Sequence, residues 1–354
     1  MKKILYLGPS GIGDWCFIYP SLAPLLKSQG AERIDVIIPY QNSGNEILTH
    51  NPQIGKVDYL QRRTKGIAIF PYFLRLLRLL FAIRKEHYEA IAVSYLSNQP
   101  DFLLLALLSG INKRIGRRTN HSWLQRHAIS IPINDNGARH KVDIHHRYAH
   151  GQKNDQTIPL IDTTLLPHKN TLFSKYNFSQ PYVALGIGGG RNASWRFWPA
   201  AKFRLLIEQC PEIEFILLGG GPDDQRQAEE ICAPPTLGNV TNLVDRIGIE
   251  GAITILANAD VVIGNDSGIA NLACVMGTKT LCLYGPTNPT LTGPALLGAT
   301  PIYIQVPCGP CFGDDQNPAT AMACTDRRCL SEISINKVKT LLETEFSHKH
   351  NNLR

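Results

Sequence analysis

Short apolar runs alternate with longer segments of mixed polarity along the chain, and most of these runs end in glycine-rich or polar turns. In the first half we predict strands at residues 3–7, 34–39, 88–95 and 114–116, and helices at 15–27, 72–85 and 102–108. In the second half we predict strands at 183–187, 215–218, 240–242, 259–263 and 280–284, and helices at 199–209, 223–232, 249–258, 269–276 and 333–346. Strands that alternate with helices favour parallel sheets, so the pattern predicts an α/β fold.

A polar, irregular stretch at residues 162–180, which contains Pro167, separates the two halves. A chain of 354 residues is long enough for two domains, because domains commonly contain ~100–200 residues. We therefore predict an N-terminal domain over 1–170, a second domain over 171–332, and a C-terminal helix and tail over 333–354. Two doubly wound domains leave a cleft between the carboxyl edges of their sheets, where small-molecule sites commonly lie.

Residues 259–294 form the most informative stretch. An apolar strand ends in a polar turn between Gly264 and Gly268, and an apolar helix follows directly. Asp266, Ser267 and Gly268 are therefore expected where the carboxyl end of a strand meets the N-terminus of a helix. Free backbone N–H groups and the helix dipole make this position an anion site. The alternative is that Asp266 or Ser267 only caps the helix.

Three further loops follow predicted strands, and they are Gly8 to Asp14, Gly186 to Pro199 and Gly219 to Asp224. In the second loop, Gly188 and its neighbouring glycines would bring backbone N–H groups close to phosphate, and Arg191 and Arg196 add positive charge. Asp14 is placed to accept a proton from a hydroxyl, and Asp223 to accept ribose hydroxyls. Helix capping is the alternative for both carboxylates, and a plain flexible loop is the alternative for the second loop. Together, the favoured interpretations suggest a nucleotide-linked substrate.

Composition and charge limit the kinds of molecule that the protein is expected to bind. Hydrophobic residues make up 44% and charged residues 18% of the chain, as in ordinary globular proteins, and the net charge of +7 suits an acidic ligand or an anionic membrane surface. No zinc-finger, RNA-recognition or basic-zipper pattern is present, so nucleic acid is not an expected partner. We expect no signal peptide, because the apolar run from Ile4 to Leu7 is too short and no small-residue cleavage site follows it. We expect no membrane span, because no apolar run reaches ~18 residues. The odd number of cysteines predicts a reducing cytoplasm.

Two basic features lie in the first half of the chain. The predicted helix at 72–85 is mostly apolar and contains Arg75 and Arg78. This composition suits either a membrane surface or a core helix that shows two arginines to solvent. A cluster that follows it contains Arg117 and Arg118. The cluster would attract a phosphorylated substrate or lipid head groups, and a solvated loop is the alternative.

Four cysteines near the C-terminus follow the spacing Cys-x2-Cys-x12-Cys-x4-Cys, and they are Cys308, Cys311, Cys324 and Cys329. Four thiolates at this spacing suit tetrahedral zinc, or iron, in a structural site. Such a metal would hold the loop in one conformation. Four reduced thiols in an ordered loop are the alternative.

Four motifs occur in order along nearly the whole chain. They are Gly13-Asp14 with Pro20 and Leu22, Arg196-Phe197-Trp198-Pro199, Gly221-Pro222-Asp223, and the stretch from Asp266-Ser267-Gly268 to Gly293-Pro294. In these motifs the chain resembles glycosyltransferase family nine, the lipopolysaccharide heptosyltransferases. It departs from the family at two positions, since Asn271 stands where members often carry His and Arg196 where they often carry Lys. Arg keeps the charge, whereas Asn keeps a hydrogen bond but cannot be cationic.

The resemblance implies a GT-B fold, with an N-terminal Rossmann-like domain for the acceptor and a C-terminal one for the nucleotide sugar, facing each other across a cleft. It implies an inverting, metal-independent transfer of a heptose, usually from ADP-heptose, to a saccharide acceptor of a surface glycolipid such as lipopolysaccharide. Asp14 would be the general base, and the acceptor would be bound by Gly13, Arg117 and Arg118. The residues implied for the donor are Gly188, Arg196, Asp223, Asp266, Ser267, Gly268 and Asn271.

The expected enzyme needs no cofactor for catalysis, is cytoplasmic, and makes a peripheral contact with the inner face of the membrane. One alternative is the same fold with another nucleotide sugar or a protein acceptor. The other is a non-catalytic relative that only binds a nucleotide sugar. The intact Asp14 disfavours this second alternative, and Asn271 leaves it open.

Overall fold

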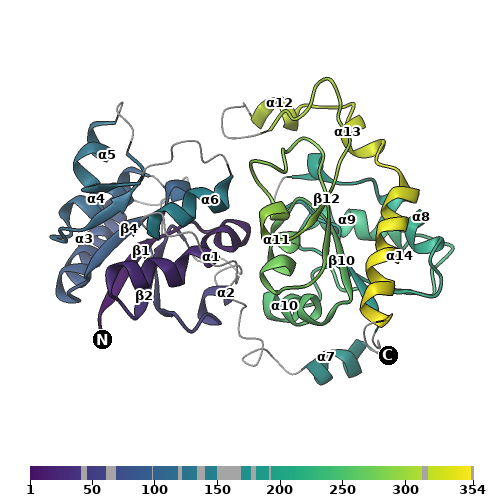
Figure 1. Cartoon of the computed structure of the whole chain (residues 1–354), viewed down its shortest axis with the longest axis horizontal. Coiled ribbons are helices and arrows are strands. Elements are labelled where there is room, and N and C mark those ends of the chain that lie inside the picture. Colours follow the sequence, from purple (N-terminus) through teal and green to yellow (C-terminus); the bar gives the residue numbers. More distant parts are fainter. Residues whose placement is uncertain are drawn as a thin grey trace. The chain divides into compact units, whose positions relative to one another are not determined.

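The computed structural model of the chain describes residues 1–40, 46–60, 69–97, 99–118, 122–133, 140–149, 169–176, 181–190, 193–312 and 318–351. The structure separates into two compact units, Met1–Asp162 and Thr163–Arg354 (Figure 1). Each unit contains one six-stranded sheet with helices packed around it. All pairings within the two sheets are parallel, so the predicted α/β fold is confirmed.

The sheet of the N-terminal unit has the strand order β3-β2-β1-β4-β5-β6. Its strands are β1 (Lys3–Leu7), β2 (Arg33–Ile38), β3 (Ile54–Tyr59), β4 (Ala90–Val93), β5 (Arg114–Gly116) and β6 (Ile131–Pro132). Its α-helices are α1 (Ile12–Gln29), α2 (Glu46–Thr49), α3 (Ile69–Lys85), α4 (Pro100–Leu108), α5 (Trp123–Ala128) and α6 (Lys141–His146), and its 3₁₀ helices are η2 (Tyr95–Ser97) and η3 (Arg147–Ala149). In the central strand β1, Ile4 pairs with Ile34 on one side and Ala90 on the other.

The sheet of the C-terminal unit has the strand order β12-β11-β10-β7-β8-β9. Its strands are β7 (Tyr182–Gly186), β8 (Glu214–Leu218), β9 (Val240–Asn242), β10 (Val261–Asn265), β11 (Thr280–Leu283) and β12 (Thr300–Ile302). Its helices are α7 (Lys169–Tyr176), η5 (Ser194–Arg196), α8 (Ala200–Glu208), α9 (Pro222–Ile231), α10 (Ile249–Asn258), α11 (Gly268–Val275), η6 (Pro294–Leu297), α12 (Pro318–Met322), α13 (Arg328–Ser331) and α14 (Ile335–Asn351). The central strands β7 and β10 are buried along their whole lengths, which explains why they are uninterrupted apolar runs.

Both sheets have the same topology. Counted from the first strand of each unit, the order is third, second, first, fourth, fifth, sixth, which is the doubly wound order of dinucleotide-binding folds. The first and fourth strands are therefore neighbours, and the connections leave them in opposite directions. This switch point lies between β1 and β4 in one unit and between β7 and β10 in the other. Ligands of such sheets bind at the carboxyl ends of these strands.

Every predicted strand is present, three of them (3–7, 114–116 and 240–242) with the predicted ends and the others with ends shifted by one or two residues, but β3, β6 and β12 were missed. Strand β3 contains Lys56 and Asp58 and is only partly buried, so it lacks a clear apolar pattern. Strand β12 lies at a sheet edge and contains Pro301, a residue that weakens a strand prediction. Helix α1 begins at Ile12, earlier than predicted, and Asp14 therefore lies in its first turn. Within the described parts of the chain, no helix is long and apolar enough to cross a membrane.

Candidate functional site

The switch point of the C-terminal unit brings two of the predicted loops together. Strands β7 and β10 are parallel neighbours, and Gly186 at the end of β7 pairs with Gly264. A Cβ on Gly264 would lie 3.3 Å from the carbonyl oxygen of Gly186, so glycine allows a close approach of the two strands here. The loop from Gly186 and the turn at Asp266 consequently start at the same edge of the sheet.

Asn265, the last residue of β10, ties these loops to each other. Its Nδ2 donates to the carbonyl oxygen of Ile187 at 2.6 Å, and its Oδ1 accepts from the backbone N–H of Trp198 at 2.9 Å. Gln227 of α9 supports the same two segments, because its Nε2 donates to the carbonyl oxygens of Ile187 and Trp198, both at 3.1 Å. The loop is therefore held by two buried side-chain amides. Neither was predicted, although a polar residue that ends a buried strand is a usable signal.

The N-terminus of α11 presents two buried polar atoms that have no hydrogen-bond partner in the described part of the chain. They are Ser267 Oγ and Asn271 Oδ1, and both residues are only 5% exposed. Ser267 occupies the N-cap position, yet its side chain makes no capping hydrogen bond, so capping does not explain it. Buried polar atoms are nearly always paired, and unpaired ones beside a helix N-terminus indicate a bound polar ligand.

Arg196 lies beside this helix N-terminus. Its Nη1 donates to the backbone carbonyl of Asp266 at 3.3 Å. Its guanidinium carbon lies 4.5 Å from the ring centre of Trp195 and 4.8 Å from that of Phe312. The planar group thus contacts two aromatic rings, which favours Arg over Lys. The arrangement provides a fixed positive charge that can bind two oxygens of a diphosphate.

Asp266 is buried next to Gly293, which lies at the end of the motif that begins at Asp266. Gly293 has φ +82°, and a Cβ at this position would lie 2.7 Å from Asp266 Oδ1 and 2.4 Å from Tyr284 Oη. Glycine is therefore required at position 293 both by the backbone conformation and by this contact. Thr287, in the loop after β11, was not predicted as a site residue, although its Oγ1 is also buried without a hydrogen-bond partner among the described residues.

The two neighbouring carboxylates at the start of α9 differ in environment. Asp223 lies near the surface and pairs with Arg226. Asp224 is 4% exposed, and it accepts a hydrogen bond from the backbone N–H of Gly220 at 2.8 Å. Burial raises the pKa of Asp224 to about 6. A Cβ on Gly188 would lie 2.0 Å from Asp224 Oδ2, so Gly188 leaves room for this carboxylate. The buried Asp224 carboxylate therefore packs against the glycine-rich loop at Gly188.

In the N-terminal unit, the loop after β1 leads into α1. Gly11 is the N-cap of α1 and Asp14 lies in its first turn, so Asp14 does not cap the helix. Its side chain is 35% exposed, and Lys141 Nζ of α6 lies 4.0 Å from its Oδ1. A Cβ on Gly8 would lie 2.4 Å from the indole ring of Trp15, so this glycine serves packing. Lys141 is a cation beside Asp14 that the sequence motifs did not indicate.

The basic residues near β5 divide into two groups. Arg114 is structural, because its Nε donates to the carbonyl of Ala128 and its Nη1 to that of Ile111, both at 2.8 Å. Arg117 and Arg118 directly follow β5 and are exposed. Since the strands are parallel, they emerge at the sheet edge from which the loop after β1 also starts. This edge of the N-terminal unit therefore carries Asp14 together with several cations.

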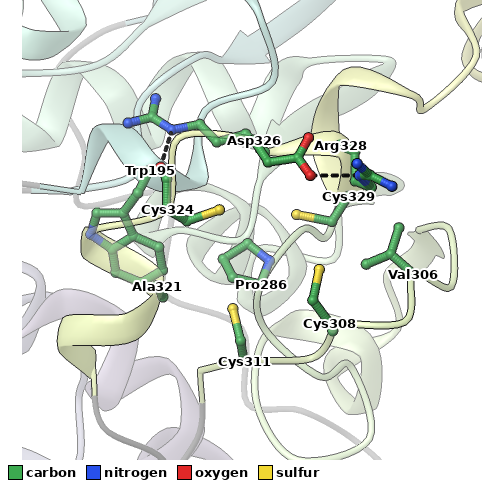
Figure 2. A pocket seen from close by; sticks show the side chains of 12 residues that line it. Trp195, Pro286, Val306, Cys308, Cys311, Ala321, Cys324, Asp326, Arg328 and Cys329 are labelled. Carbon is green, nitrogen blue, oxygen red and sulfur yellow. Dashed lines mark hydrogen bonds and ion pairs between the residues drawn. The ribbon is translucent and has the colours of Figure 1, made fainter.

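The four C-terminal cysteines line one cavity of the C-terminal unit (Figure 2). Trp195, whose neighbour is Arg196, lines it too, and Arg327 Nη1 donates to the carbonyl of Ser194 at 3.3 Å. Burial and then the neighbouring thiols raise the pKa of Cys329 to about 11. All four cysteines are free, and the described residues contain no group of three or more His, Cys, Asp or Glu side chains already arranged around a metal position. The sulfur atoms thus share a cavity without forming a closed ligand set.

Comparison with known proteins places this geometry in a family. The sequence profile of glycosyltransferase family 9 (heptosyltransferase) matches residues 76–320, which is more than half of the chain. The lipooligosaccharide heptosyltransferase 2 of Haemophilus influenzae is 27% identical over 324 residues, which cover 85% of this chain and 88% of that protein. The lipopolysaccharide heptosyltransferase 1 of Pseudomonas aeruginosa is 31% identical over 121 residues, and the match spans 33% of either protein.

A solved structure supports the same assignment at the level of the fold. The structure of the Escherichia coli ADP-heptose lipopolysaccharide heptosyltransferase II superposes with a TM-score of 0.77 at 19% identity, over 99% of this chain and 100% of that one. The predicted GT-B architecture is therefore confirmed. The chain belongs to glycosyltransferase family 9, the heptosyltransferase family, and it is a glycosyltransferase.

Proposed function

We propose that the chain transfers a heptose from ADP-heptose to a saccharide acceptor during the synthesis of lipopolysaccharide or a related surface glycan. The observation that supports this most directly is that Ser267 Oγ and Asn271 Oδ1, at the N-terminus of α11, are buried without a hydrogen-bond partner among the described residues. They lie in the unit that carries Arg196, in a chain that belongs to the heptosyltransferase family. A nucleoside diphosphate sugar supplies the phosphate oxygens and hydroxyl groups that such a site would bind.

The donor half of the proposed mechanism belongs to the C-terminal unit. Arg196 and the N–H groups at the start of α11, with Ser267 and Gly268, bind the diphosphate, and Asp266 and Asn271 lie where the sugar would bind. Asp223 accepts the ribose hydroxyls, while Asp224 and Gly188 shape the loop. As the bond between the anomeric carbon and the phosphate oxygen breaks, negative charge grows on the leaving ADP. A positive site fixed in advance stabilises this charge more in the transition state than in the ground state.

The acceptor half belongs to the N-terminal unit. Asp14 accepts the proton of the acceptor hydroxyl while that oxygen forms the new bond to the anomeric carbon, so the sugar is transferred with inversion. Lys141 of α6 places a positive charge 4.0 Å from this carboxylate. Gly13, Arg117 and Arg118 contact the acceptor, and the arginines suit a saccharide that carries carboxylate or phosphate groups. No step in this scheme requires a metal ion.

The cysteine cavity suits a structural zinc or iron ion, since four sulfur ligands match the tetrahedral preference of both. The ion would link the loop after β12 to α13, next to the segment that carries Arg196. Elemental analysis of the purified protein is expected to give one metal ion per chain, and Cys311→Ser to abolish it. Purified protein without a metal ion, or an unchanged melting temperature after a chelator removes the ion, would contradict a structural ion. The free cysteines also agree with a cytoplasmic location, and contact with the inner membrane is the peripheral interaction that we propose.

The decisive experiment measures ADP release and sugar transfer with purified full-length protein, ADP-heptose and a heptose-free lipopolysaccharide acceptor. Ser267→Ala and Asn271→Ala each remove one unpaired buried group. We expect donor binding to weaken by roughly tenfold in each variant, whereas the stability of the ligand-free protein stays the same or increases. Ser28→Ala, which removes a hydroxyl bonded within α1, is the matched control. Unchanged donor affinity in both site variants would contradict the proposed donor site.

Asn271 favours one alternative, a different nucleotide sugar as donor. Members of the family often have His here, and an amide presents another hydrogen-bonding pattern and no positive charge. GDP- and UDP-sugars should therefore be tested beside ADP-heptose by thermal shift and by transfer. If one of these sugars raises the melting temperature more than ADP-heptose does and is transferred faster, that sugar is the donor. Binding of ADP-heptose without any ADP release would instead identify a non-catalytic relative.

A further inference from the structure

Exposed apolar side chains are concentrated on three consecutive helices of the N-terminal unit. Phe70 is 69% exposed and Phe81 66% exposed on α3, and Trp123 is 60% exposed on α5. The other large exposed apolar residues of these helices are Phe73 on α3 and Leu104 and Leu108 on α4. In the described part of the C-terminal unit, by contrast, the corresponding residues are Leu205 in α8, Tyr303 just after β12 and Met322 in α12, which lie in separate segments.

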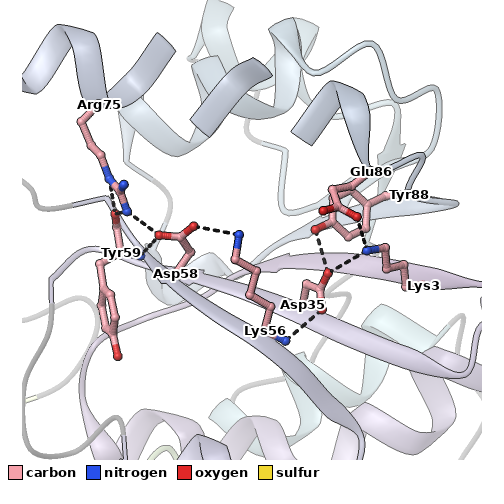
Figure 3. Close-up of polar contacts among 8 residues, drawn as sticks. All are labelled: Lys3, Asp35, Lys56, Asp58, Tyr59, Arg75, Glu86 and Tyr88. Carbon is pink, nitrogen blue, oxygen red and sulfur yellow. Dashed lines mark hydrogen bonds and ion pairs between the residues drawn. The ribbon is translucent and has the colours of Figure 1, made fainter. Parts of the chain in front are cut away.

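Helix α3 packs against the core of the N-terminal unit with one side, and its other side is exposed. Leu79 and Ile83 on the inner side are buried in the core. Arg75 also points inward, since its Nε and Nη2 donate to the carbonyl of Tyr59 at 3.0 and 2.7 Å and it pairs with Asp58 (Figure 3). The prediction that both arginines of this helix face solvent is therefore wrong for Arg75.

The outer side of α3 forms one stripe. Phe70, Leu77 and Phe81 are spaced seven and four residues apart, so they lie on one face of the helix. Phe73 is three residues from Phe70 and four from Leu77, and it adjoins the same stripe. The helix is therefore apolar on both sides. A helix that packs against one globular core needs an apolar side only toward that core.

Helices α4 and α5 extend this surface. Figure 1 shows α3, α4 and α5 next to one another in the N-terminal unit, and α4 contacts both of the others. Arg84 near the end of α3 donates from Nε and Nη2 to the carbonyl of Leu108, at 3.0 and 2.7 Å. This contact joins the ends of α3 and α4 next to an exposed leucine. The ring of Trp123 stacks on His127 at the outer edge of α5. We call this surface the α3–α5 face.

The charge on the α3–α5 face has one predominant sign. Helix α3 contains no Asp or Glu, and besides the inward-pointing Arg75 its basic residues are Arg78, Arg84 and Lys85. Helix α5 adds Arg126, and the acidic residue of the three helices is Asp101 in the first turn of α4. Aromatic side chains between cations match the interface of an anionic bilayer, where rings enter the head-group region and cations meet lipid phosphates.

We propose that the α3–α5 face docks the N-terminal unit on an anionic phospholipid surface. The inference rests on the proposed function insofar as that function requires an acceptor carried by a glycolipid. It assigns the membrane contact to the unit that carries Asp14, Arg117 and Arg118. An acceptor anchored in the same bilayer would then be presented to this unit without leaving the membrane. A conventional protein partner fits the surface less well, because it would have to offer acidic side chains to Arg78, Lys85 and Arg126 as well as an apolar surface to the exposed rings.

Sedimentation of the full-length protein with vesicles tests the proposal. Vesicles of phosphatidylethanolamine and phosphatidylglycerol are compared with vesicles of phosphatidylcholine alone, at low and at high salt. We expect at least tenfold stronger binding to the anionic vesicles, decreasing with salt. Phe73→Ser combined with Phe81→Ser should weaken this binding at least fivefold, and Arg78→Glu should weaken it at low salt. Leu205→Ser combined with Met322→Ser is the matched control on exposed apolar residues of the other unit.

Three results would overturn the proposal: no binding of the wild type to anionic vesicles, equal binding to both lipid compositions, or unchanged binding of the Phe73 and Phe81 double variant. A further measurement excludes self-association as the reason for the exposed face. If gel filtration shows that the double variant converts a dimer into a monomer, the face is a contact between two copies and the proposal is wrong. Transfer to a water-soluble acceptor fragment needs no membrane, so it tests the proposed function independently of docking.

Discussion

The two units share one strand order but use their switch points differently. In the C-terminal unit, the groups at β7 and β10 are deeply buried, two side-chain amides hold the loops, and Ser267 and Asn271 each present a buried unpaired atom. In the N-terminal unit, Asp14 is partly exposed beside Lys141, and exposed arginines follow β5. The same topology therefore carries buried, unpaired polar atoms among the described residues of one unit and an exposed cationic edge in the other.

The comparison extends to the outer surfaces. In its described part, the C-terminal unit exposes only scattered large apolar side chains, whereas the N-terminal unit leaves an aromatic and cationic face on α3 to α5. A unit that binds only a soluble nucleotide sugar needs no such face. A unit that receives an acceptor from a bilayer gains from it, because a bound surface raises the local concentration of the acceptor.

The largest effect is expected at Asp14, the group that would distinguish the N-terminal unit as the site of proton transfer. Asp14→Ala should reduce kcat by roughly 10²–10⁴-fold, because general base catalysis contributes about that much. Donor affinity and the melting temperature should stay unchanged, since the side chain is partly exposed and does not cap α1. Asp143→Ala, an exposed carboxylate of α6, is the control. Near-normal turnover of Asp14→Ala would rule out its role as the base.

The second largest effect is expected on the stability of the C-terminal unit, where buried side-chain amides hold the loops. Asn265→Leu removes the acceptor of the Trp198 N–H and the donor to the Ile187 carbonyl, and it leaves both buried. The free energy of unfolding should fall by about 2–4 kcal/mol, as measured by urea denaturation. Asn258→Leu, at the C-terminus of α10, replaces an amide that makes a local bond to Thr254 and should cost much less. Equal losses in the two variants would contradict the special role of Asn265.

Arg196 is expected to show an intermediate effect on the donor alone. Arg196→Lys keeps the positive charge but loses the planar contacts to Trp195 and Phe312. The donor Kd should rise by roughly tenfold, and a further rise is expected for Arg196→Ala. Lys339→Ala on the exposed side of α14 provides the control for loss of a surface cation. If Arg196→Lys binds donor as the wild type does, the aromatic contacts are not needed for the site.

The smallest predicted effect is a dependence of stability on pH at Asp224. Its pKa is raised from the ordinary 3.8 to about 6, so the folded protein binds this proton more tightly than the unfolded chain does. The contribution of Asp224 to stability is therefore greatest below pH 4, falls as the pH rises from about 4 to 6, and remains unfavourable above that range. Asp224→Asn removes this dependence.

Relative to wild type, Asp224→Asn should thus gain on the order of 1–2 kcal/mol in the free energy of unfolding between pH 4 and pH 7.5. Urea denaturation at the two pH values measures this gain. Asp223→Asn is the control, because its carboxylate lies near the surface and pairs with Arg226. The same gain in both variants would show that burial beneath Gly188 is not its cause.

Much of the fold and the outline of the site followed from the sequence alone. Buried parallel strands are short apolar runs, and glycine-rich turns mark their carboxyl ends, so strands, loops and the α/β class were readable locally. The motifs around Asp14, Arg196, Asp223 and Asp266 also identified the family. These features depend on residue type and short spacing, which is the information that a sequence contains directly.

Only the tertiary structure decided how these parts combine. The order of strands set Gly186 beside Gly264, and it is a non-local property that no single run of residues specifies. Burial distinguished Asp224 from its neighbour Asp223, and the hydrogen bonds at the start of α11 showed that the Ser267 side chain does not cap this helix. The apolar face of α3 was likewise visible only once the core had covered its other side. Packing determines which polar group loses water and which apolar group keeps it, and this selection gives each unit its proposed task.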